Sequence, residues 1–401
     1  MMGTHSAGPL HGLRVTMLLA SPVTFDARVL REATALADAG ADVVIACLVT
    51  ELQPETVGGI RIRAVAPPSI LGANGRRVGA LRRRAQLARA WISLATADDP
   101  DIIHCHEIFT VWVGMLLSTL RRIAFVYDAH ELYPETSGHT RRTIRNWRML
   151  EWAAVRMAWL VIAANDLRSQ RMAHTYRTDP PLAIRNVPPL LPQRPAPDPL
   201  AAEMRADVAA DTLLIYQGAL SDTRGLDAVV DAIALLPERY HLALIGNPPP
   251  APQLAARLAV AAEHGRVHVF PPVKPAEMLS WLVVADAGVV TYVPDCLNNS
   301  LCAPNKMHDY AAAGLPVLAA SLPGVERDLE EYGPGLSFTP CDPESFARAA
   351  EQLFTEPGLL ERSREGARRM HESLNWPNEA ERLVAAYTVL QHRLCARRRR
   401  P

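Results

Sequence analysis

The chain has 401 residues, 49% of them hydrophobic and 21% charged, which are values of a globular protein long enough for two domains. Its formal net charge is zero, so composition gives no reason to expect a nucleic-acid partner. No apolar run approaches the roughly 20 residues that span a membrane, the first residues lack a signal-peptide pattern, and the six cysteines include no CxxC pair. We therefore expect a reduced, cytoplasmic protein.

Short apolar runs alternate with amphipathic segments through the first half of the chain. We predict strands at residues 13–20, 43–48, 60–66, 101–105, 123–127 and 159–163, and helices at 26–39, 79–95, 109–120, 141–157 and 165–176. Strands that alternate with helices predict a parallel sheet covered on both faces.

A proline-rich stretch at 186–199, NVPPLLPQRPAPDP, interrupts this pattern, and its prolines argue against regular structure. Beyond it we predict strands at 212–217, 242–245, 267–270, 287–292, 315–318 and 335–338, and helices at 226–236, 251–263, 276–284, 304–313, 343–355, 358–372 and 376–394. The predicted fold class is α/β, with two Rossmann-like parallel-sheet domains facing a central cleft. We place the first domain at 1–190, a linker at 191–204, the second domain at 205–373, and a closing helix with a basic tail at 374–401.

The stretch 303–320, APNKMHDYAAAGLPVLAA, combines a short helix and a strand with polar groups at the helix start. Asn305 and Lys306 lie in the first turn, where backbone N–H groups and a lysine suit a phosphate. Asp309 follows one turn later, where a carboxylate suits the paired hydroxyls of a ribose. The alternative is a capped surface helix with a solvated lysine and aspartate.

Two other strand ends carry candidate site residues. Gly218 directly follows strand 212–217 and lets the backbone approach a ligand, while Arg224 opens the next helix and suits two phosphate oxygens. The alternative there is a turn glycine and a solvated arginine. His130 follows strand 123–127 between Asp128 and Glu131. A lone histidine is more often structural than catalytic, but this position beside two carboxylates favours a site role more than most positions do.

The strand at 101–105 leads into His104-Cys105-His106-Glu107. Two histidines and a thiol are metal-ligand types, but successive strand residues point to opposite faces, so only the two histidines share a side. We expect no metal site here.

Five blocks of the chain resemble, in the same order, those of the group 1 (family 4-type) retaining glycosyltransferases, whose GT-B fold has two Rossmann-like domains. These blocks are DARVLREATALADAGADV, PDIIHCHE, FVYDAHELYPE, YQGALSDTRGLDAVVDAI and PNKMHDYAAAGLPVLAA. The last is the most specific, and the closing helix after Trp376 resembles the family's segment that returns to the N-terminal domain.

The resemblance implies roles for the candidate residues. Arg224 and Lys306 would contact the donor pyrophosphate, Asp309 the nucleotide ribose, and His130 the transferred sugar near the reaction centre. Gly218 and Asn305 complete the expected donor site, and the loop 270–274 would lie by the base. The acceptor-side candidates are Asp26, Arg28, His106, Glu107 and Glu131.

The chain departs from the family pattern at three places. Leu301 occupies the position of the first of two glutamates eight residues apart, and Asp309 stands for the second. Arg224 replaces the more usual lysine, and the loop 21–25 lacks the common Gly-Gly pair.

The resemblance predicts transfer of a hexose or N-acetylhexosamine from a nucleotide sugar, UDP-linked by preference, to a glycan, lipid-linked or small-molecule acceptor. Arginine, lysine and a helix dipole would neutralise the pyrophosphate, so we expect no metal and no cofactor. Two alternatives remain, a sugar-nucleotide 2-epimerase and a non-catalytic nucleotide-sugar-binding partner subunit.

Arginines cluster around the predicted helix 79–95. Leu81, Ala85, Ala88, Ile92 and Ala95 share one face, Arg82, Arg83 and Arg89 lie opposite, and Arg76 and Arg77 precede the helix. Together with the arginines at 141, 142, 145 and 148 they suit peripheral contact with anionic lipid at the inner face of the membrane. The alternative is an ordinary solvated helix face.

Overall fold

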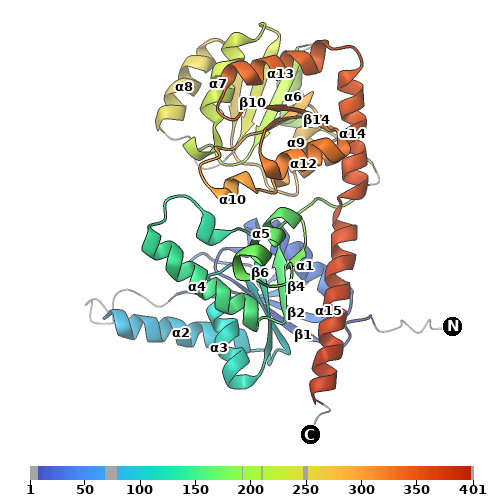
Figure 1. Ribbon diagram of the computed structural model, residues 1–401. Coiled ribbons are helices and arrows are strands. Elements are labelled where there is room, and N and C mark those ends of the chain that lie inside the picture. Colours follow the sequence, from blue (N-terminus) through green and yellow to red (C-terminus); the bar gives the residue numbers. More distant parts are fainter. Residues whose placement is uncertain (1–7, 68–78, 192, 209–210, 247–251, 399–401) are drawn as a thin grey trace, which may run out of the picture. The chain divides into compact units, whose positions relative to one another are not determined.

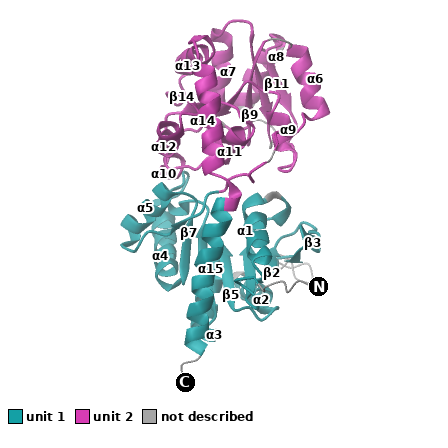
Figure 2. Cartoon of the chain, turned by 90° about the vertical axis from the view of Figure 1, so that its right-hand side faces the viewer, with its two compact units in different colours: residues 1–185, 378–401 teal, residues 186–377 magenta. Residues whose placement is uncertain are grey.

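The computed structural model describes residues 8–67, 79–191, 193–208, 211–246 and 252–398. The chain divides into two compact units (Figure 2): unit 1 comprises residues 1–185 and 378–401, and unit 2 comprises residues 186–377. Each unit has its own parallel sheet, so the predicted α/β class with two Rossmann-like sheets is confirmed.

Unit 1 contains an eight-stranded sheet in the order β3-β4-β2-β1-β5-β6-β7-β8. All its strand pairs are parallel except β3–β4, a small antiparallel hairpin at one edge. Its strands are β1 (Arg14–Leu19), β2 (Asp42–Leu48), β3 (Thr56–Val57), β4 (Ile60–Val65), β5 (Ile102–His106), β6 (Ala124–Ala129), β7 (Leu160–Ala163) and β8 (Leu182–Ala183). Its helices are η1 (Val23–Phe25), α1 (Ala27–Asp38), α2 (Ala80–Thr96), α3 (Val111–Arg121), η2 (Tyr133–Glu135), α4 (Arg141–Met157), α5 (Asp166–Tyr176) and, apart from its first two residues, α15 (Trp376–Arg398).

Unit 2 contains a six-stranded, all-parallel sheet in the order β11-β10-β9-β12-β13-β14 (Figure 1). Its strands are β9 (Thr212–Gln217), β10 (Tyr240–Ile245), β11 (Val267–Phe270), β12 (Ala287–Val290), β13 (Val317–Ala320) and β14 (Gly335–Phe338). Its helices are α6 (Pro199–Val208), η3 (Asp222–Arg224), α7 (Leu226–Leu235), α8 (Pro252–Glu263), α9 (Met278–Leu282), α10 (Leu297–Ser300), α11 (Asn305–Ala312), α12 (Pro323–Tyr332), α13 (Pro343–Thr355) and α14 (Leu359–Ser373).

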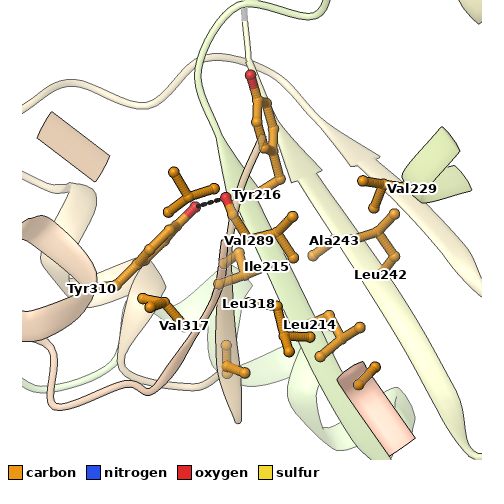
Figure 3. Packing of buried hydrophobic residues seen from close by; sticks show 14 of the residues in the cluster. Leu214, Ile215, Tyr216, Val229, Leu242, Ala243, Val289, Tyr310, Val317 and Leu318 are labelled. Atoms are coloured by element: carbon orange, nitrogen blue, oxygen red, sulfur yellow. Dashed lines mark hydrogen bonds between the residues drawn. The ribbon is translucent and has the colours of Figure 1, made fainter. Parts of the chain in front are cut away.

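Helix α11 is fastened to the sheet of unit 2 by Tyr310, which is fully buried. Its hydroxyl accepts a hydrogen bond from the backbone N–H of Gln217 in β9 (3.1 Å) and donates to the carbonyl of Val289 in β12 (3.2 Å; Figure 3). Its ring fills the place of a side chain at Gly288, where a Cβ would lie 2.3 Å from ring carbons. Glycine is therefore required at 288. The two hydrogen bonds of Tyr310 fix the helix predicted within 303–320 against β9 and β12.

Strand order reverses once in each sheet. In unit 1 the chain moves outward from β1 on one side and from β5 on the other, and in unit 2 the same happens at β9 and β12. The loops that follow the carboxyl ends of these strands diverge, and ligands of open parallel sheets bind at such points. The candidate residues of the sequence analysis fall on or beside these loops.

Helices α6, α10 (Leu297–Ser300) and α12 of unit 2 were not predicted from the sequence, and proline explains the first and the last. Helix α6 begins at Pro199, at the end of the stretch predicted to lack regular structure, and α12, which was not predicted, has Pro323 in its first turn. Proline breaks a helix interior but is tolerated at the first position, where its missing N–H has no intrahelical partner.

Helix α2 exposes much of its first half, since Leu81 is 82% exposed. The side of α2 that packs against the rest of unit 1 carries Trp91, Leu94 and Ala95. Of the apolar face predicted for this helix, Ala95 is buried and Leu81 is not. Arg76 and Arg77 lie outside the described residues. Within the described ranges no helix combines the length and hydropathy needed to cross a membrane, and peripheral lipid contact stays a prediction.

Candidate functional site

The candidate donor-site residues of unit 2 gather where β9 and β12 diverge. Gly218 follows β9 with φ of +131°, a conformation that side chains rarely adopt, and a Cβ built there would lie 3.4 Å from Lys306 Nζ. Lys306 comes from the first turn of α11 and is only 7% exposed. A glycine at the end of β9 therefore lets the lysine ammonium approach the backbone closely.

Two tyrosines hold the cations of this group. The Lys306 ammonium lies 4.0 Å from the ring centroid of Tyr216 and 5.0 Å from that of Tyr292, and the Arg224 guanidinium lies 4.6 Å from the Tyr292 centroid. Burial and then the nearby Arg224 hold the pKa of Lys306 well below its usual range. Among the side chains that the structure describes, no carboxylate forms an ion pair with either cation, so the arrangement suits an anionic ligand.

The remaining donor-site candidates lie on α11. Asp309 accepts a hydrogen bond from Gln217 Nε2 (2.8 Å), which orients the carboxylate at the end of β9. Asn305 is exposed at the first residue of the helix, whose start has no side-chain cap. The first-turn N–H groups of α11 thus lie beside Lys306, as a phosphate site requires.

A second group of residues lies in unit 1 at the carboxyl ends of β5 and β6. We call it the unit 1 charge cluster; its members are Arg28, Glu32, His104, His106, Asp128 and His130. All are buried except His130, whose side chain is 15% exposed. Burial of this many ionisable groups requires that each be paired or neutral.

Arg28 is the central cation of the charge cluster. Its Nε and Nη2 donate to the two oxygens of Asp128 (3.0 and 2.7 Å), and its Nη1 donates to the carbonyl of Ile184 (2.7 Å). The same Nε lies 3.0 Å from Glu32 Oε1. One guanidinium therefore contacts two carboxyl groups, and its two parallel hydrogen bonds to Asp128 form a bidentate pair.

His130 sits at the exposed side of the cluster. Its Nε2 lies 3.0 Å from Asp128 Oδ2 and 3.1 Å from His106 Nδ1, and its Nδ1 lies 3.4 Å from Glu107 Oε1. Arg168 donates to the His130 carbonyl (2.6 Å), which fixes the backbone. Contacts on both sides of the ring hold His130 in one orientation.

The charges of the cluster shift the pKa values of its members in opposite directions. Burial alone would lower the pKa of His130, but Asp128 and Glu107 raise it to about 9, so the ring is an imidazolium at neutral pH. Burial and then the adjacent His104 hold the pKa of His106 well below its usual range. Arg28 and His130 outweigh burial and keep Asp128 ionised.

Four members of the cluster are of types that bind metals. Ligand atoms of Glu32, His104, His106 and Asp128 lie within 4.8 Å of one another. Both carboxylates, however, already contact the guanidinium of Arg28, which supplies the positive charge that a metal ion would bring. The residues present therefore fit a metal ion poorly.

The structure places the other acceptor-side candidates in different settings. Asp26 caps α1, with Oδ1 accepting from Val29 N (3.2 Å), and Glu131 is exposed. Glu107 has a positive φ of 62°, and burial raises its pKa to about 7. Arg28 and His106 are buried, so their contacts are with the charge cluster.

Sequence reasoning missed several residues that position these groups. Glu32 lies one helical turn after Arg28 and could have been found from the i, i+4 spacing on an otherwise apolar helix face. Tyr216 and Tyr292 sit in or beside apolar strands, and Tyr387 of α15 reaches His104 Nδ1 (2.7 Å) from 283 residues away. No local pattern marks such distant partners.

Comparison with known proteins gives consistent results for both halves of the chain. The family model Glycosyltransferase Family 4 matches residues 27–186, and the model Glycosyl transferases group 1 matches residues 211–356. A D-inositol 3-phosphate glycosyltransferase from Xylanimonas cellulosilytica is 25% identical over 96% of this chain and 99% of its own length.

Solved structures agree at the level of the fold. Sucrose-phosphate synthase from Thermosynechococcus elongatus superposes with a TM-score of 0.75 at 17% identity, covering 95% of this chain and 99% of that one. The Anabaena protein HepE in complex with UDP-glucose gives 0.73 at 16% identity, covering 94% and 100%.

The two parallel sheets, with a basic group at the strand reversal of unit 2, define the class as GT-B proteins. The chain belongs to the family 4, or group 1, glycosyltransferases. The resemblance found in the sequence is thereby confirmed.

The buried carboxyl of Glu32 generates a prediction about pH and stability. Burial, and then the charge of Asp128, raise its pKa above the unfolded value, outweighing Arg28. A raised carboxyl pKa means that stability is lost as pH rises above the unfolded value of about 4.3. Glu32→Gln removes this titration, so the free energy of unfolding of the variant should fall less between pH 5 and pH 9, by about 1 kcal/mol or more.

Urea unfolding at both pH values measures this difference. Glu131→Gln, at an exposed carboxylate of the same unit, is the matched control and should keep the slope of the original protein. An unchanged slope in Glu32→Gln would show that Glu32 is ionised throughout.

Proposed function

We propose that this glycosyltransferase is a retaining enzyme that transfers a hexose or N-acetylhexosamine from a UDP-sugar. The observation that carries the proposal is the pair Lys306 and Arg224, two cations held on tyrosine rings at the strand reversal of unit 2, with which no described carboxylate forms an ion pair. HepE, which has the same fold, was crystallised with UDP-glucose. The relatives named D-inositol 3-phosphate glycosyltransferase make that compound the first acceptor to test, beside glycan and lipid-linked acceptors.

Breaking a sugar–diphosphate bond builds negative charge on the leaving diphosphate. Lys306, Arg224 and the N-terminal end of α11 would stabilise that charge, and Gly218 keeps space for the phosphate beside the backbone. The carboxylate of Asp309, fixed by Gln217, would accept hydrogen bonds from the ribose hydroxyls. Exposed Asn305 would complete the binding of the nucleotide.

Positive charge builds at the same time on the anomeric carbon of the sugar. His130 would contact the sugar through the Nδ1 side of its ring, where the only charged neighbour among the described side chains is Glu107 at 3.4 Å, because Nε2 is held more closely by Asp128 and His106. Arg28 and His106 would act by positioning Asp128 and His130, while Asp26, Glu107 and Glu131 remain the candidates for contact with the acceptor. We further propose a cytoplasmic location for the reaction.

The donor site yields a prediction that combines affinity with proton uptake. Lys306 has a lowered pKa, and a bound diphosphate raises it again, so UDP binding should take up protons at alkaline pH. Calorimetry in buffers of different ionisation enthalpy measures this uptake. Lys306→Ala should abolish it and weaken UDP binding by about tenfold or more, the loss typical of one charged hydrogen bond.

Arg224→Ala should also weaken UDP binding but leave proton uptake in place. The exposed Arg348 of α13 provides a matched control, since Arg348→Ala removes the same charge elsewhere in unit 2. UDP affinities equal to that of the control in both site variants would refute the donor-site assignment.

The position of His130 predicts an effect on turnover rather than on nucleotide binding. His130→Ala should lower kcat by about 100-fold or more while the Kd for UDP changes less than threefold, the pattern of an interaction made mainly in the transition state. Steady-state kinetics and calorimetry on the same preparation measure the two quantities. Equal losses in kcat and affinity, or an unfolded variant by circular dichroism, would assign His130 a structural role.

Charge neutralisation by Arg224 and Lys306 predicts that no divalent ion is needed for transfer. Activity should stay within about twofold of its original value in excess EDTA, and elemental analysis of the purified protein should find less than one tenth of a metal ion per chain. Loss of activity on chelation that magnesium or manganese restores would contradict this proposal.

A further inference from the structure

A pocket lies in unit 2, at the edge of the sheet opposite the candidate donor site. It encloses about 760 Å³ and is lined by residues 311–315, which precede β13, and by residues 283–286, which precede β12. Gly218 and Lys306 lie at the carboxyl ends of the strands of this sheet, whereas the pocket lies at the amino ends. The four-residue strands β12 and β13 therefore separate the pocket from the candidate donor site by about 13 Å. We call it the α14 pocket, because one face of α14 forms its charged wall.

Arginine dominates the charged lining of the α14 pocket. Arg205 pairs with Asp286 (3.0 Å) and Arg364 with Glu361 (2.6 Å), so each of these two cations has an acidic partner. The other two, Arg194 and Arg368, have no ion-pair partner among the side chains that the structure describes. Glu372, which is exposed, is the remaining acidic residue of the lining.

Arg194 lies near two other arginines of the pocket, Arg364 and Arg368, whose charges repel its own. The pKa of Arg194 is lowered by partial desolvation and then by the charges of Arg364 and Arg368. Its Nη2 donates to the carbonyl of Val283 (3.2 Å), which holds the guanidinium at the pocket. A planar guanidinium with further N–H donors and like-charged neighbours favours binding of an oxyanion.

A buried histidine marks the inner wall of the pocket. His371 is 9% exposed, and neither of its ring nitrogens has a hydrogen-bond partner within the described part of the chain. Burial lowers its pKa, so at neutral pH the ring offers one N–H donor and one acceptor. Buried polar groups nearly always have a partner, and a hydroxyl group satisfies either nitrogen.

Apart from Gln193, the rest of the lining is apolar. It includes Leu190, Leu191 and Leu315 and the small residues 311–314. The volume is that of pockets that enclose a small metabolite. The pocket thus combines arginines at one side, a hydrogen-bonding ring inside and an apolar floor.

From this combination we propose that the α14 pocket binds a small phosphorylated polyol, with its phosphate on Arg194 and Arg368 and a hydroxyl on His371. This site is separate from the proposed donor site and does not depend on that assignment. Neither the family match nor any residue of the donor site takes part in the argument.

The test observes His371 directly in the full-length chain. With ¹³C-labelled histidine, the ring resonance of His371 is identified among those of the 13 histidines by its loss in His371→Gln. Glucose 6-phosphate serves as the probe, and its titration should shift this resonance saturably. Glucose without the phosphate should cause no saturable shift at the same concentrations.

Substitution of the two arginines tests the phosphate contact. Arg194→Ala/Arg368→Ala should weaken the glucose 6-phosphate titration at least tenfold, whereas the control Arg348→Ala/Arg362→Ala, which removes two exposed arginines outside the pocket, should stay within twofold. Lys306→Ala should leave the titration unchanged, which distinguishes this pocket from the donor site. Absence of the shift, equal binding in both double variants, or loss of the shift in Lys306→Ala would overturn the proposal.

Discussion

The ion contacts of Arg28 are the interaction on which unit 1 depends. A single guanidinium joins α1 to Asp128 of β6 and to the carbonyl of Ile184, partners 100 and 156 residues away in sequence. Removing one member of a buried ion pair leaves the other uncompensated, which typically costs about 3–5 kcal/mol. Because His130 takes its orientation and charge from Asp128, the same contacts that hold the unit together also prepare the proposed contact with the sugar.

In unit 2, aromatic rings instead of carboxylates contact the buried or partly buried cations. Lys306 is buried, yet its neighbours are the faces of Tyr216 and Tyr292. A ring face attracts a cation more weakly than a carboxylate does, so a cation held this way keeps most of its attraction for an incoming anion. A carboxylate in place of either tyrosine would compete with the ligand. The contrast between the two units agrees with the proposed roles, in which unit 1 holds a charge in place and unit 2 offers one to the donor.

Much of the fold was predictable because both units are built from local patterns. The alternation of apolar strands and helices predicted the two parallel sheets, and the block around Lys306 identified the helix start that carries this lysine. What was not predictable is long-range. The aromatic partners of Lys306 lie 90 and 14 residues away, and Arg28, which was predicted as an acceptor-side candidate, is buried between Asp128 and Glu32. Proline misled at Pro199 because the same residue both ends and begins helices.

Unit 1 is formed by two separate segments of the sequence, residues 1–185 and 378–401, and the second segment is nearly all helix α15. Leu383, Leu390 and Leu394 are buried, Tyr387 bonds to His104, and the carboxylate of Glu379 accepts from the backbone of Arg185. The strands of unit 1 are complete at residue 183, but the ribosome reaches Tyr387 about 10 to 40 s later at ordinary rates of synthesis. During that time unit 2 is synthesised. The surface of unit 1 that α15 covers in the folded chain, including His104, has no α15 residues to pack against. Unit 1, whose sheet is translated first, is therefore the second of the two units to be completed.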